Sequence, residues 1–449
     1  MGVNEAQETS INFMTIAIVT VIACFIVNFI YKTVFGNDRK EAGRARVESE
    51  GDSSAQAESN ADVQSVSRPL GKNKKRPQQK GKSEFNHPWL LKSLKGHPGT
   101  ILHADISANG KFLAATCDDG SVILWDIRDL SMKEHKTLRV NIEFDHASFI
   151  AWSPDSKGFL VHTVRENNIA AYKIEKKKDG TIASASRSVT FEKIHEDDVV
   201  GFGISSNRKY MMSCSSKTDM IIWDLKGQPL ERLDTYLMST YSAKISPCGR
   251  FIVATGFSPD VKVMEVCYTK NGDFKEVKKA FELVGHTSGI YDVAFDVDSS
   301  RIVTISKDGT WRLYHTKIDY IRGESPYVLK SGTYTQTALP PRIALSPNGE
   351  VLVVSVNSGL EVYQMFTGAR YAAIDNVYSG TVTHMRFEAD GRFLYVCGDR
   401  AIRILHNVCG YDSAILRCRS LLESKQTSAT KERLNKTIEE SQEFLEKFK

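Results

Sequence analysis

The chain has 449 residues and a formal net charge of only +5, so the distribution of its charge is more informative than the total. Its eight cysteines include no C-x-x-C pair and no His/Cys spacing suited to zinc, so the sequence shows no sign of a disulfide framework or of a zinc site of that kind, and leaves open only disulfides between distant parts of the chain. This usage favours a reducing compartment. Four of the cysteines are predicted to be small buried thiols in strands or turns: Cys117, Cys214, Cys248 and Cys397.

The chain begins with a short segment, residues 1–10, followed by an apolar run over residues 11–31. The run reads INFMTIAIVTVIACFIVNFIY and contains 21 residues without a charge, enough for a helix across a bilayer core of about 30 Å. No basic residue precedes it, it is longer than the apolar part of a signal peptide, and no small-residue cleavage site follows. The sequence therefore predicts an uncleaved transmembrane helix.

The flanking charges predict the orientation of this helix. Residues 1–10 contain no Lys or Arg, whereas residues 32–46 contain five. The positive-inside rule places the C-terminal side in the cytosol and the short N-terminus in the lumen. The span is diluted by Asn12, Thr15, Thr20 and Asn28, which suits the thinner bilayer of the endoplasmic reticulum.

Residues 32–83 are predicted to be a disordered, basic linker, because their central part is rich in Ser, Ala and acidic residues. Its end is a run of seven basic residues without an acid: Arg68, Lys72, Lys74, Lys75, Arg76, Lys80 and Lys82. Such a run is a candidate contact for RNA, the ribosome or an acidic partner. The default interpretation of such a run is a solvated tether, and contact with anionic lipid or a role in nuclear import are further alternatives. No aromatic residues are interleaved, so sequence-specific binding of nucleic acid is not supported.

Residues 84–410 repeat one four-stranded unit seven times. The turn after the first strand of each unit recurs at intervals of 41 to 52 residues, at Ser107, Ser153, Ser205, Ser246, Asp296, Ser346 and Glu388. The aromatic residue on the third strand, or its substitute, recurs at intervals of 41 to 51 residues, at Trp125, Tyr172, Trp223, Met264, Tyr314, Tyr363 and Leu405. Because the two series of positions repeat with matching intervals, they indicate seven propeller blades.

With its Gly-His and Trp-Asp signatures, this region resembles the WD40 family of seven-bladed β-propellers. The resemblance implies a hydrogen-bonded tetrad of His, Ser or Thr, Asp and Trp in each blade. The matching residues are His97, Asp119 and Trp125, with Cys117 in place of the hydroxyl; His195, Ser215 and Trp223, with Lys217 in place of Asp; His286, Ser306, Asp308 and Tyr314; and Asp399. No tetrad is complete on this assignment, so packing between blades is predicted to supply most of the stability.

Residues 411–449 are predicted to form one amphipathic helix, with Leu434, Ile438, Leu445 and Phe448 on one stripe. Two arrangements remain open for it. The helix either packs on the propeller rim or stays solvated, or it forms a short coiled coil with a partner.

The expected fold class is thus all-β, a seven-bladed propeller between an N-terminal transmembrane helix and a C-terminal helix. No G-x-S-x-G elbow, H-E-x-x-H motif or Gly-rich phosphate loop is present, so we expect neither an enzyme nor a bound cofactor or metal.

Five strings spread over several blades resemble one branch of the WD40 family that carries its anchor before the propeller. They begin at Phe144, Ser246, Pro259, Ser306 and Cys397. This resemblance implies an adaptor of the endoplasmic reticulum membrane. It would bind the stress-sensing kinase of the translation initiation factor and associate with ribosomes and mRNA in the unfolded-protein response. The alternative is an exchange factor for a coat-recruiting small GTPase, whose anchor, however, follows the propeller.

Overall fold

A computed structural model describes residues 85–193 and 195–448. The predicted lumenal segment 1–10, the predicted span 11–31, the linker up to residue 83 and its seven basic residues lie outside the described part of the chain. Among the described residues, no helix combines the length and apolar character needed to cross a membrane.

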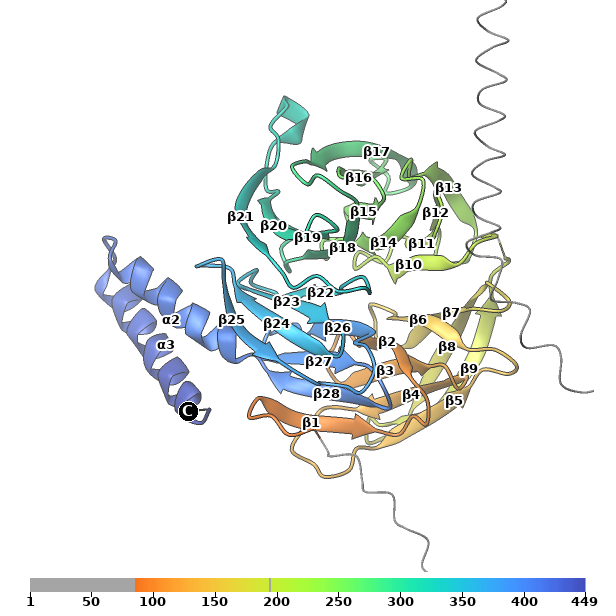
Figure 1. Ribbon diagram of the computed structural model, residues 1–449. Coiled ribbons are helices and arrows are strands. Elements are labelled where there is room, and N and C mark those ends of the chain that lie inside the picture. Colours follow the sequence, from red (N-terminus) through yellow and green to blue (C-terminus); the bar gives the residue numbers. More distant parts are fainter. Residues whose placement is uncertain (1–84, 194, 449) are drawn as a thin grey trace, which may run out of the picture. The chain divides into compact units, whose positions relative to one another are not determined.

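Seven four-stranded antiparallel sheets are arranged around one axis (Figure 1). The first four sheets are formed by β2 (Ile101–Ile106), β3 (Phe112–Cys117), β4 (Ser121–Asp126) and β5 (Thr137–Asn141); β6 (Ala147–Trp152), β7 (Gly158–Thr163), β8 (Ile169–Lys176) and β9 (Ile182–Thr190); β10 (Val199–Ile204), β11 (Met211–Ser215), β12 (Asp219–Trp223) and β13 (Pro229–Asp234); β14 (Thr240–Ile245), β15 (Phe251–Gly256), β16 (Val261–Tyr268) and β17 (Phe274–Leu283).

The remaining three sheets complete the ring. They are formed by β18 (Ile290–Phe295), β19 (Arg301–Ser306), β20 (Thr310–His315) and β21 (Tyr327–Thr333); β22 (Ile343–Leu345), β23 (Val351–Val356), β24 (Gly359–Gln364) and β25 (Ala369–Ile374); β26 (His384–Phe387), β27 (Phe393–Cys397), β28 (Ala401–His406) and β1 (Leu90–Lys95). A short 3-10 helix, η1 (Tyr320–Arg322), lies between β20 and β21. We number the blades 1 to 7 in this order. The predicted seven-bladed propeller is confirmed.

Strand β1 closes the ring because it comes from the start of the described chain and pairs with β28 near its end. Leu94 pairs with Ile402 and is almost fully buried. The outer strand of blade 7 is therefore supplied from more than 300 residues away in sequence. With β1 in place, blade 7 has its full four strands, and the edge of β28 is not exposed where the ring closes.

The two landmarks used to count the blades occupy equivalent places in all seven. The backbone amide of each turn residue, from Ser107 to Glu388, donates to the carbonyl five residues later. Each third-strand landmark, from Trp125 to Leu405, pairs with a residue near the start of the second strand of its blade. Examples are Trp125 with Leu113 and Tyr314 with Ile302. The spacing in the sequence thus reflects a shared register.

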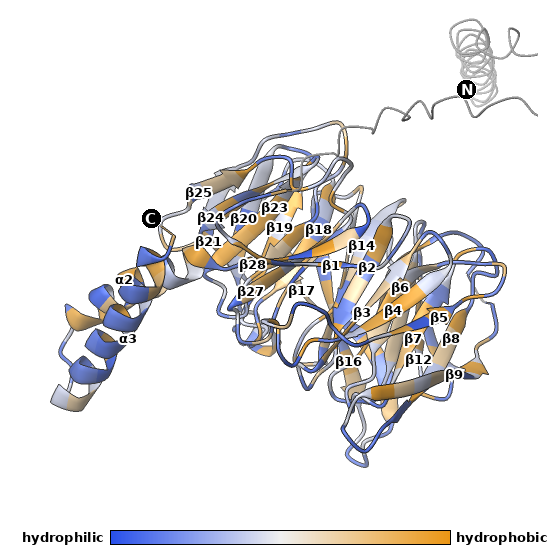
Figure 2. Ribbon diagram, turned by 90° about the horizontal axis from the view of Figure 1, so that it is seen from below, coloured by the Kyte–Doolittle hydropathy of each residue, from blue (hydrophilic) through white to orange (hydrophobic). Residues whose placement is uncertain are grey.

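The hydrophobic core is divided among the interfaces between neighbouring blades. One cluster joins Trp125 and Ile101 of blade 1 to Leu94 and Ile404 of blade 7, and the next joins Phe112 of blade 1 to Trp152 and its neighbours in blade 2. Figure 2 shows the hydrophobic residues concentrated in the strands of the sheets. Because each blade buries its faces against two others, stability depends on completing the ring.

The C-terminal segment forms two helices, α2 (Val408–Leu422) and α3 (Ser428–Glu446), so the prediction of one helix over residues 411–449 was wrong. The side chain of Thr427 accepts a hydrogen bond from the amide of Thr430 and begins α3 as an N-cap. The apolar stripe used for the prediction lies wholly after this cap, beginning at Leu434, so it carried no information about where the helix begins.

The two helices form a hairpin that packs on the propeller. Arg417 of α2 forms an ion pair with Glu350 at 3.0 Å, and Gln364 of β24 donates to Asp412 at 3.2 Å. Phe444 of α3 stacks on Tyr411 of α2, with ring centroids 3.9 Å apart. Packing on the rim, one of the two arrangements left open by the sequence, is the one observed within this chain.

Candidate docking face and its polar networks

The connectivity of the blades sorts their loops into two ends. Within each antiparallel sheet, the connections between second and third strands share one end with the connections that lead to the next blade. The turns between first and second strands and between third and fourth strands lie at the opposite end. The predicted tetrads belong to the first of these ends, because their histidines lie in the connections between blades.

Blade 3 contains a complete tetrad. His195 Nδ1 lies 2.7 Å from Asp219, His195 Nε2 lies 2.7 Å from the Ser213 hydroxyl, and the Trp223 indole donates to the same hydroxyl at 2.8 Å. Arg232 on the outer strand holds Asp219 from the other side, at 2.5 Å. Burial lowers the pKa of His195 despite the opposing effect of Asp219, which keeps the ring neutral near pH 7.

The sequence assignment misplaced two positions of this tetrad, the hydroxyl at Ser215 and the carboxylate position at Lys217. Ser215 lies at the end of β11, and its hydroxyl is buried without a hydrogen-bond partner in the described chain. Lys217 points outward and pairs with Asp197 at 3.2 Å. The carboxylate is supplied two residues later, by Asp219, which lies on the same face of β12 as Trp223 because strand side chains alternate. Counting in steps of two back from Trp223 identifies it.

Blade 5 has the same arrangement with one substitution. His286 Nδ1 lies 2.9 Å from Asp308, and His286 Nε2 lies 2.8 Å from the hydroxyl of Thr304, so the predicted Ser306 was wrong. Ser306 instead donates to the backbone carbonyl of Ser288. Burial raises the pKa of Asp308, but hydrogen bonds from Thr310, Thr287 and His286 outweigh it and bring the value to about 2. Tyr314 replaces Trp and donates to the carbonyl of Val284 at 3.1 Å.

Blade 1 lacks one hydrogen bond. The Ser121 hydroxyl donates to Asp119 at 2.6 Å and lies 3.1 Å from His97 Nδ1, so it links the two. The residue equivalent to Ser213 and Thr304 is Ala115, ten positions before Trp125, and the predicted Cys117 is not in that place. His97 Nε2 is consequently buried without a hydrogen-bond partner. Burial lowers the pKa of His97 to about 4.

His97, Cys117 and Asp119 place one potential metal-binding atom each within 4.8 Å of one another. Burial raises the pKa of the Cys117 thiol to about 12, and Asp119 already accepts from Ser121 and from Arg139. A thiol must lose its proton to bind zinc well, so this chemistry does not fit a metal site. The group is better explained as the polar network of blade 1.

Asp399, the tetrad position predicted in blade 7, fixes a loop. Its carboxylate accepts from the amide and hydroxyl of Ser379, at 2.8 and 2.5 Å, and from the amide of Gly380. Of the four cysteines predicted to be buried, Cys117, Cys214 and Cys397 are buried and Cys248 is exposed. All seven cysteines in the described chain are free thiols.

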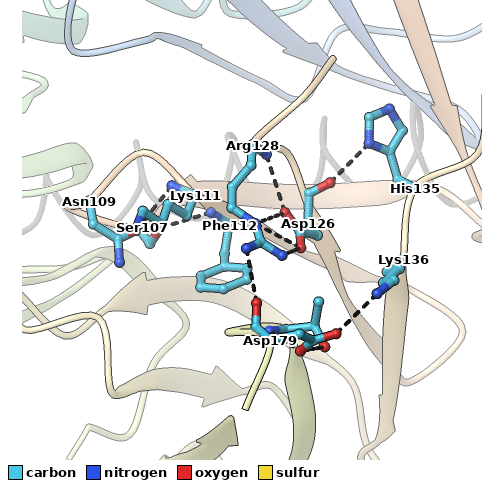
Figure 3. Close-up of polar contacts among 10 residues, drawn as sticks. Ser107, Asn109, Lys111, Phe112, Asp126, Arg128, His135, Lys136 and Asp179 are labelled. Carbon is cyan, nitrogen blue, oxygen red and sulfur yellow. Dashed lines mark hydrogen bonds and ion pairs between the residues drawn. The ribbon is translucent and has the colours of Figure 1, made fainter. Parts of the chain in front are cut away.

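The opposite end carries a charged network between blades 1 and 2, shown in Figure 3. Arg128 binds Asp126 through Nε at 2.9 Å and reaches the backbone carbonyl of Asp179 at 3.3 Å. Lys136 pairs with the Asp179 carboxylate at 3.2 Å. The hydrogen bond from Arg128 is the main cause of the lowered pKa of Asp126. Because these charges are paired with one another, the network is interpreted as a structural link between the two blades.

At the end that holds the tetrads, large apolar side chains are exposed on loops between blades. The exposed fraction is 91% for Phe144, 74% for Tyr236 and 75% for Met238. All three also have positive φ, at 59°, 56° and 60°. This left-handed conformation costs a non-glycine residue roughly 1–2 kcal/mol. Strained residues of this kind are concentrated at functional sites.

The loop with Tyr236 and Met238 is held in place by its neighbours. Leu237, which lies between them, is buried. The backbone amide of Tyr236 donates a hydrogen bond to the Asp234 carboxylate at 2.7 Å, which restrains the loop. The amide of Phe257, which is 60% exposed, donates to Ser239 of the same loop at 3.0 Å. Phe257 therefore joins Tyr236 and Met238 on one surface. We call the exposed residues Phe144, Tyr236, Met238 and Phe257 the docking face.

The sequence did not predict the docking face. Phe144 falls in one of the strings that carried the family resemblance, but nothing in the pattern marked Tyr236 or Met238 as exposed. The seven basic linker residues, which were predicted as a contact, lie outside the described part of the chain. Their proposed role is therefore argued from the sequence.

Comparison with known proteins agrees with this fold. The model of the family "WD domain, G-beta repeat" matches residues 88–126, 277–315 and 375–405, which lie in or beside blades 1, 5 and 7. The chain is thus a WD40-repeat β-propeller protein, a fold typical of scaffolds that mediate protein interactions.

Two relatives narrow the assignment. Transducin beta-like protein 2 from Homo sapiens is 38% identical over 374 residues, which cover 83% of each chain. The protein of the same name from Mus musculus is 38% identical over 373 residues, covering 83% of this chain and 84% of its own. This chain belongs to the family of transducin beta-like protein 2. A more distant relative, cilia- and flagella-associated protein 57 from Mus musculus, is 20% identical over 339 residues and covers 65% of this chain and 26% of its own.

Proposed function

We propose that the chain is a non-enzymatic adaptor, anchored in the endoplasmic reticulum membrane, whose cytosolic propeller binds partner proteins. The observation that carries this proposal is the docking face, where large apolar side chains are exposed on loops of strained backbone. Exposed aromatic and Met side chains are enriched in protein interfaces. Maintaining the strain has a cost that a binding role explains.

The anchor and its orientation rest on the sequence. The uncharged run over residues 11–31 and the five basic residues after it support a single span with the propeller in the cytosol. All seven cysteines in the described chain are free thiols, which agrees with a reducing compartment.

The partners we propose are the stress-sensing kinase of the translation initiation factor, the ribosome and mRNA. The family resemblance supports the kinase, and the basic run from Arg68 to Lys82 supports a salt-sensitive contact with the phosphates of RNA. In this arrangement the docking face binds protein, and the linker binds polyanions near the membrane surface.

Proximity labelling in cells, with and without stress of the endoplasmic reticulum, tests the proposal with a double substitution, Tyr236→Ser with Met238→Ser. Each change removes a large side chain whose atoms are mostly exposed, so the fold is expected to keep its stability within about 0.5 kcal/mol. If these side chains are central to an interface, labelling of the kinase is expected to fall at least about tenfold.

A matched control is Ile321→Ser with Met132→Ser. These side chains are 75% and 51% exposed but lie in connections at the opposite end of the propeller. The control is expected to label the kinase as the wild type does. Equal loss in both variants, or none in either, would reject the docking face. Acceleration of nucleotide release from a coat-recruiting GTPase by the full chain would favour the exchange-factor alternative instead.

A further inference from the structure

A channel of about 810 Å³ runs between the innermost strands of the propeller. In each blade, the residues two and four positions before the first turn residue (Ser107 in blade 1, Ser153 in blade 2, and so on) lie on the innermost strand or directly before it and face the same axis. Many of them form the wall of the channel. In five of the blades the polar members are His103 and Asp105 on β2, Ser242 and Lys244 on β14, Asp292 on β18, Arg342 before β22, and His384 and Arg386 on β26. The channel is therefore polar on one side, whereas blades 2 and 3 contribute Phe149, Ala151 and Gly203.

The charges of this wall do not balance. Its cations are Lys244, Arg342 and Arg386, and its carboxylates are Asp105 and Asp292, so three positive and two negative charges leave a net charge of +1. Lys244 pairs with Asp292 at 2.8 Å, and Arg386 pairs with Asp105. Both pairs bridge neighbouring blades, between β14 and β18 and between β26 and β2.

The two carboxylates also accept hydrogen bonds from neighbouring groups of the protein. Asp292 accepts from the Ser242 hydroxyl at 2.8 Å and from the amide of Ile343 at 3.0 Å. Asp105 accepts from the amide of Trp152 at 2.8 Å. Arg342 acts on Asp292 through space and helps to lower the pKa of that carboxyl, but the two short ion pairs of the wall are made by Lys244 and Arg386.

Two histidines lie in the same wall, within electrostatic range of Arg342. The ring centroids of His103 and His384 are 3.9 Å apart, with the rings tilted by 35°, and the ring centroid of Phe149 lies 5.2 Å from that of His103. His103 Nδ1 is buried without a hydrogen-bond partner in the described chain. Burial, together with smaller effects of Arg386, Lys244 and Arg342, lowers the pKa of His103 to about 3. The same effects, with His103 added, hold the pKa of His384 well below 6.5.

We propose that the channel binds a multiply charged oxyanion of the phosphate type, held by Arg342 and by His103. A phosphate group accepts several charge-assisted hydrogen bonds, and a guanidinium offers donors in a matching geometry. The protonated Nδ1 of His103 supplies one more donor. A bound anion offsets the positive charges around the two rings, so binding takes up a proton.

A metal cation does not fit the same place. Lys244, Arg342 and Arg386 repel a cation, and the only carboxylates in the wall are committed to ion pairs and backbone amides. The rings of His103 and His384 lie over one another, which does not direct their nitrogens to a common point. The polar chemistry of the channel is thus that of an anion site.

Isothermal titration of the full chain with pyrophosphate tests the proposal. All measurements use a background with Lys72, Lys74, Lys75 and Arg76 changed to Gln, because the linker itself would bind phosphate. Arg342→Gln is expected to weaken binding by about tenfold or more, since a hydrogen-bonded charge is lost. Arg342→Lys is expected to restore part of the affinity. Arg322→Gln is the matched control, because this arginine lies on η1 with its side chain 85% exposed.

Sulfate provides the second measurement, because this dianion does not itself titrate near neutral pH. Its affinity is expected to rise as the pH falls below 7, with proton uptake that differs between buffers of different ionisation enthalpy. His103→Gln is expected to remove the uptake. Binding to vesicles that contain a phosphoinositide, lost in Arg342→Gln, would assign the site to a lipid headgroup; binding of pyrophosphate alone would assign it to a soluble phosphate ester.

Three outcomes would overturn the proposal. The first is the absence of pyrophosphate binding at millimolar concentration by a chain whose thermal unfolding is normal. The second is an equal loss of affinity in Arg342→Gln and Arg322→Gln. The third is binding without proton uptake in the wild type, or proton uptake that persists in His103→Gln. Either result would show that His103 is not protonated when the anion binds.

Discussion

At the scale of single residues, the buried histidines between blades differ in how fully their ring nitrogens are hydrogen-bonded. In blades 3 and 5, both nitrogens of His195 and His286 have partners. In blade 1, His97 keeps one nitrogen without a partner, because Ala115 has no hydroxyl. A buried polar atom without a partner costs about 1–3 kcal/mol, so blade 1 has a defect that a single side chain can correct.

We expect Ala115→Ser to stabilise the protein by about 0.5–1.5 kcal/mol, because the new hydroxyl lies where Ser213 and Thr304 bind their histidines. Urea unfolding of the full chain at neutral pH measures the change. The matched control is Ala114→Ser. Ala114 is equally buried but belongs to the apolar cluster shared with blade 2, where a hydroxyl has no partner and should destabilise by about 1–3 kcal/mol. Equal destabilisation by both changes would contradict the tetrad assignment.

These residues also show what the sequence was able to predict. The histidines and the third-strand aromatics were identified because their spacing repeats once per blade. The hydroxyl positions were each assigned two residues too late in the sequence, and the carboxylate of blade 3 was missed because its distance from the third-strand aromatic differs between blades. Asp219 lies four positions before Trp223, whereas Asp308 lies six before Tyr314. Counting from the aromatic along the paired strands, as the register does, gives Ser213, Thr304 and Ala115 directly.

At the scale of secondary-structure elements, β1 and the helical hairpin are the pieces that join distant parts of the chain. Strand β1 supplies the outer strand of blade 7 and buries Leu94 against Ile402 and Ile404. The hairpin is tied to blade 6 through Arg417 and Asp412. The sequence predicted the strand content of blade 7 but not that its fourth strand comes from the other end of the propeller, since strand pairing over such a distance leaves no local pattern.

A pair of truncations tests the importance of β1. Removing residues 1–84 leaves all seven sheets intact, whereas removing residues 1–95 deletes β1 and exposes the edge of β28. We expect the shorter truncation to unfold cooperatively. The longer one should lose more than about 3 kcal/mol of stability, the typical cost of losing one buried Leu, and should associate through the open edge. Thermal unfolding and size-exclusion chromatography measure both effects. Equal unfolding midpoints would show that β1 does not close the ring.

At the scale of the whole molecule, the described propeller has two surfaces of different chemistry, a docking face of exposed apolar residues and a channel whose wall has a net positive charge. The basic linker precedes both in the sequence. The spacing of the repeat predicted the architecture, because a blade has nearly fixed length. It predicted neither the docking face nor the channel, because loop conformation and the meeting of residues from five blades depend on the closed ring. The docking face, the channel and the basic linker are therefore three separate parts of the proposed function, and each has its own test.

The linker is tested by reversing four of its charges, Lys72, Lys74, Lys75 and Arg76 to Glu. If these residues contact ribosomal RNA, cosedimentation of the full chain with ribosomes should fall, and the slope of log K against log salt should decrease by about 3, since each phosphate contact contributes about 0.7–0.9. The matched control reverses four charges in and beside the C-terminal hairpin: Lys425, Lys431, Arg433 and Lys436. It changes the net charge equally, so a purely global charge effect lowers binding in both variants. Unchanged cosedimentation of the linker variant would remove RNA contact from the proposed function and leave the basic run as a tether.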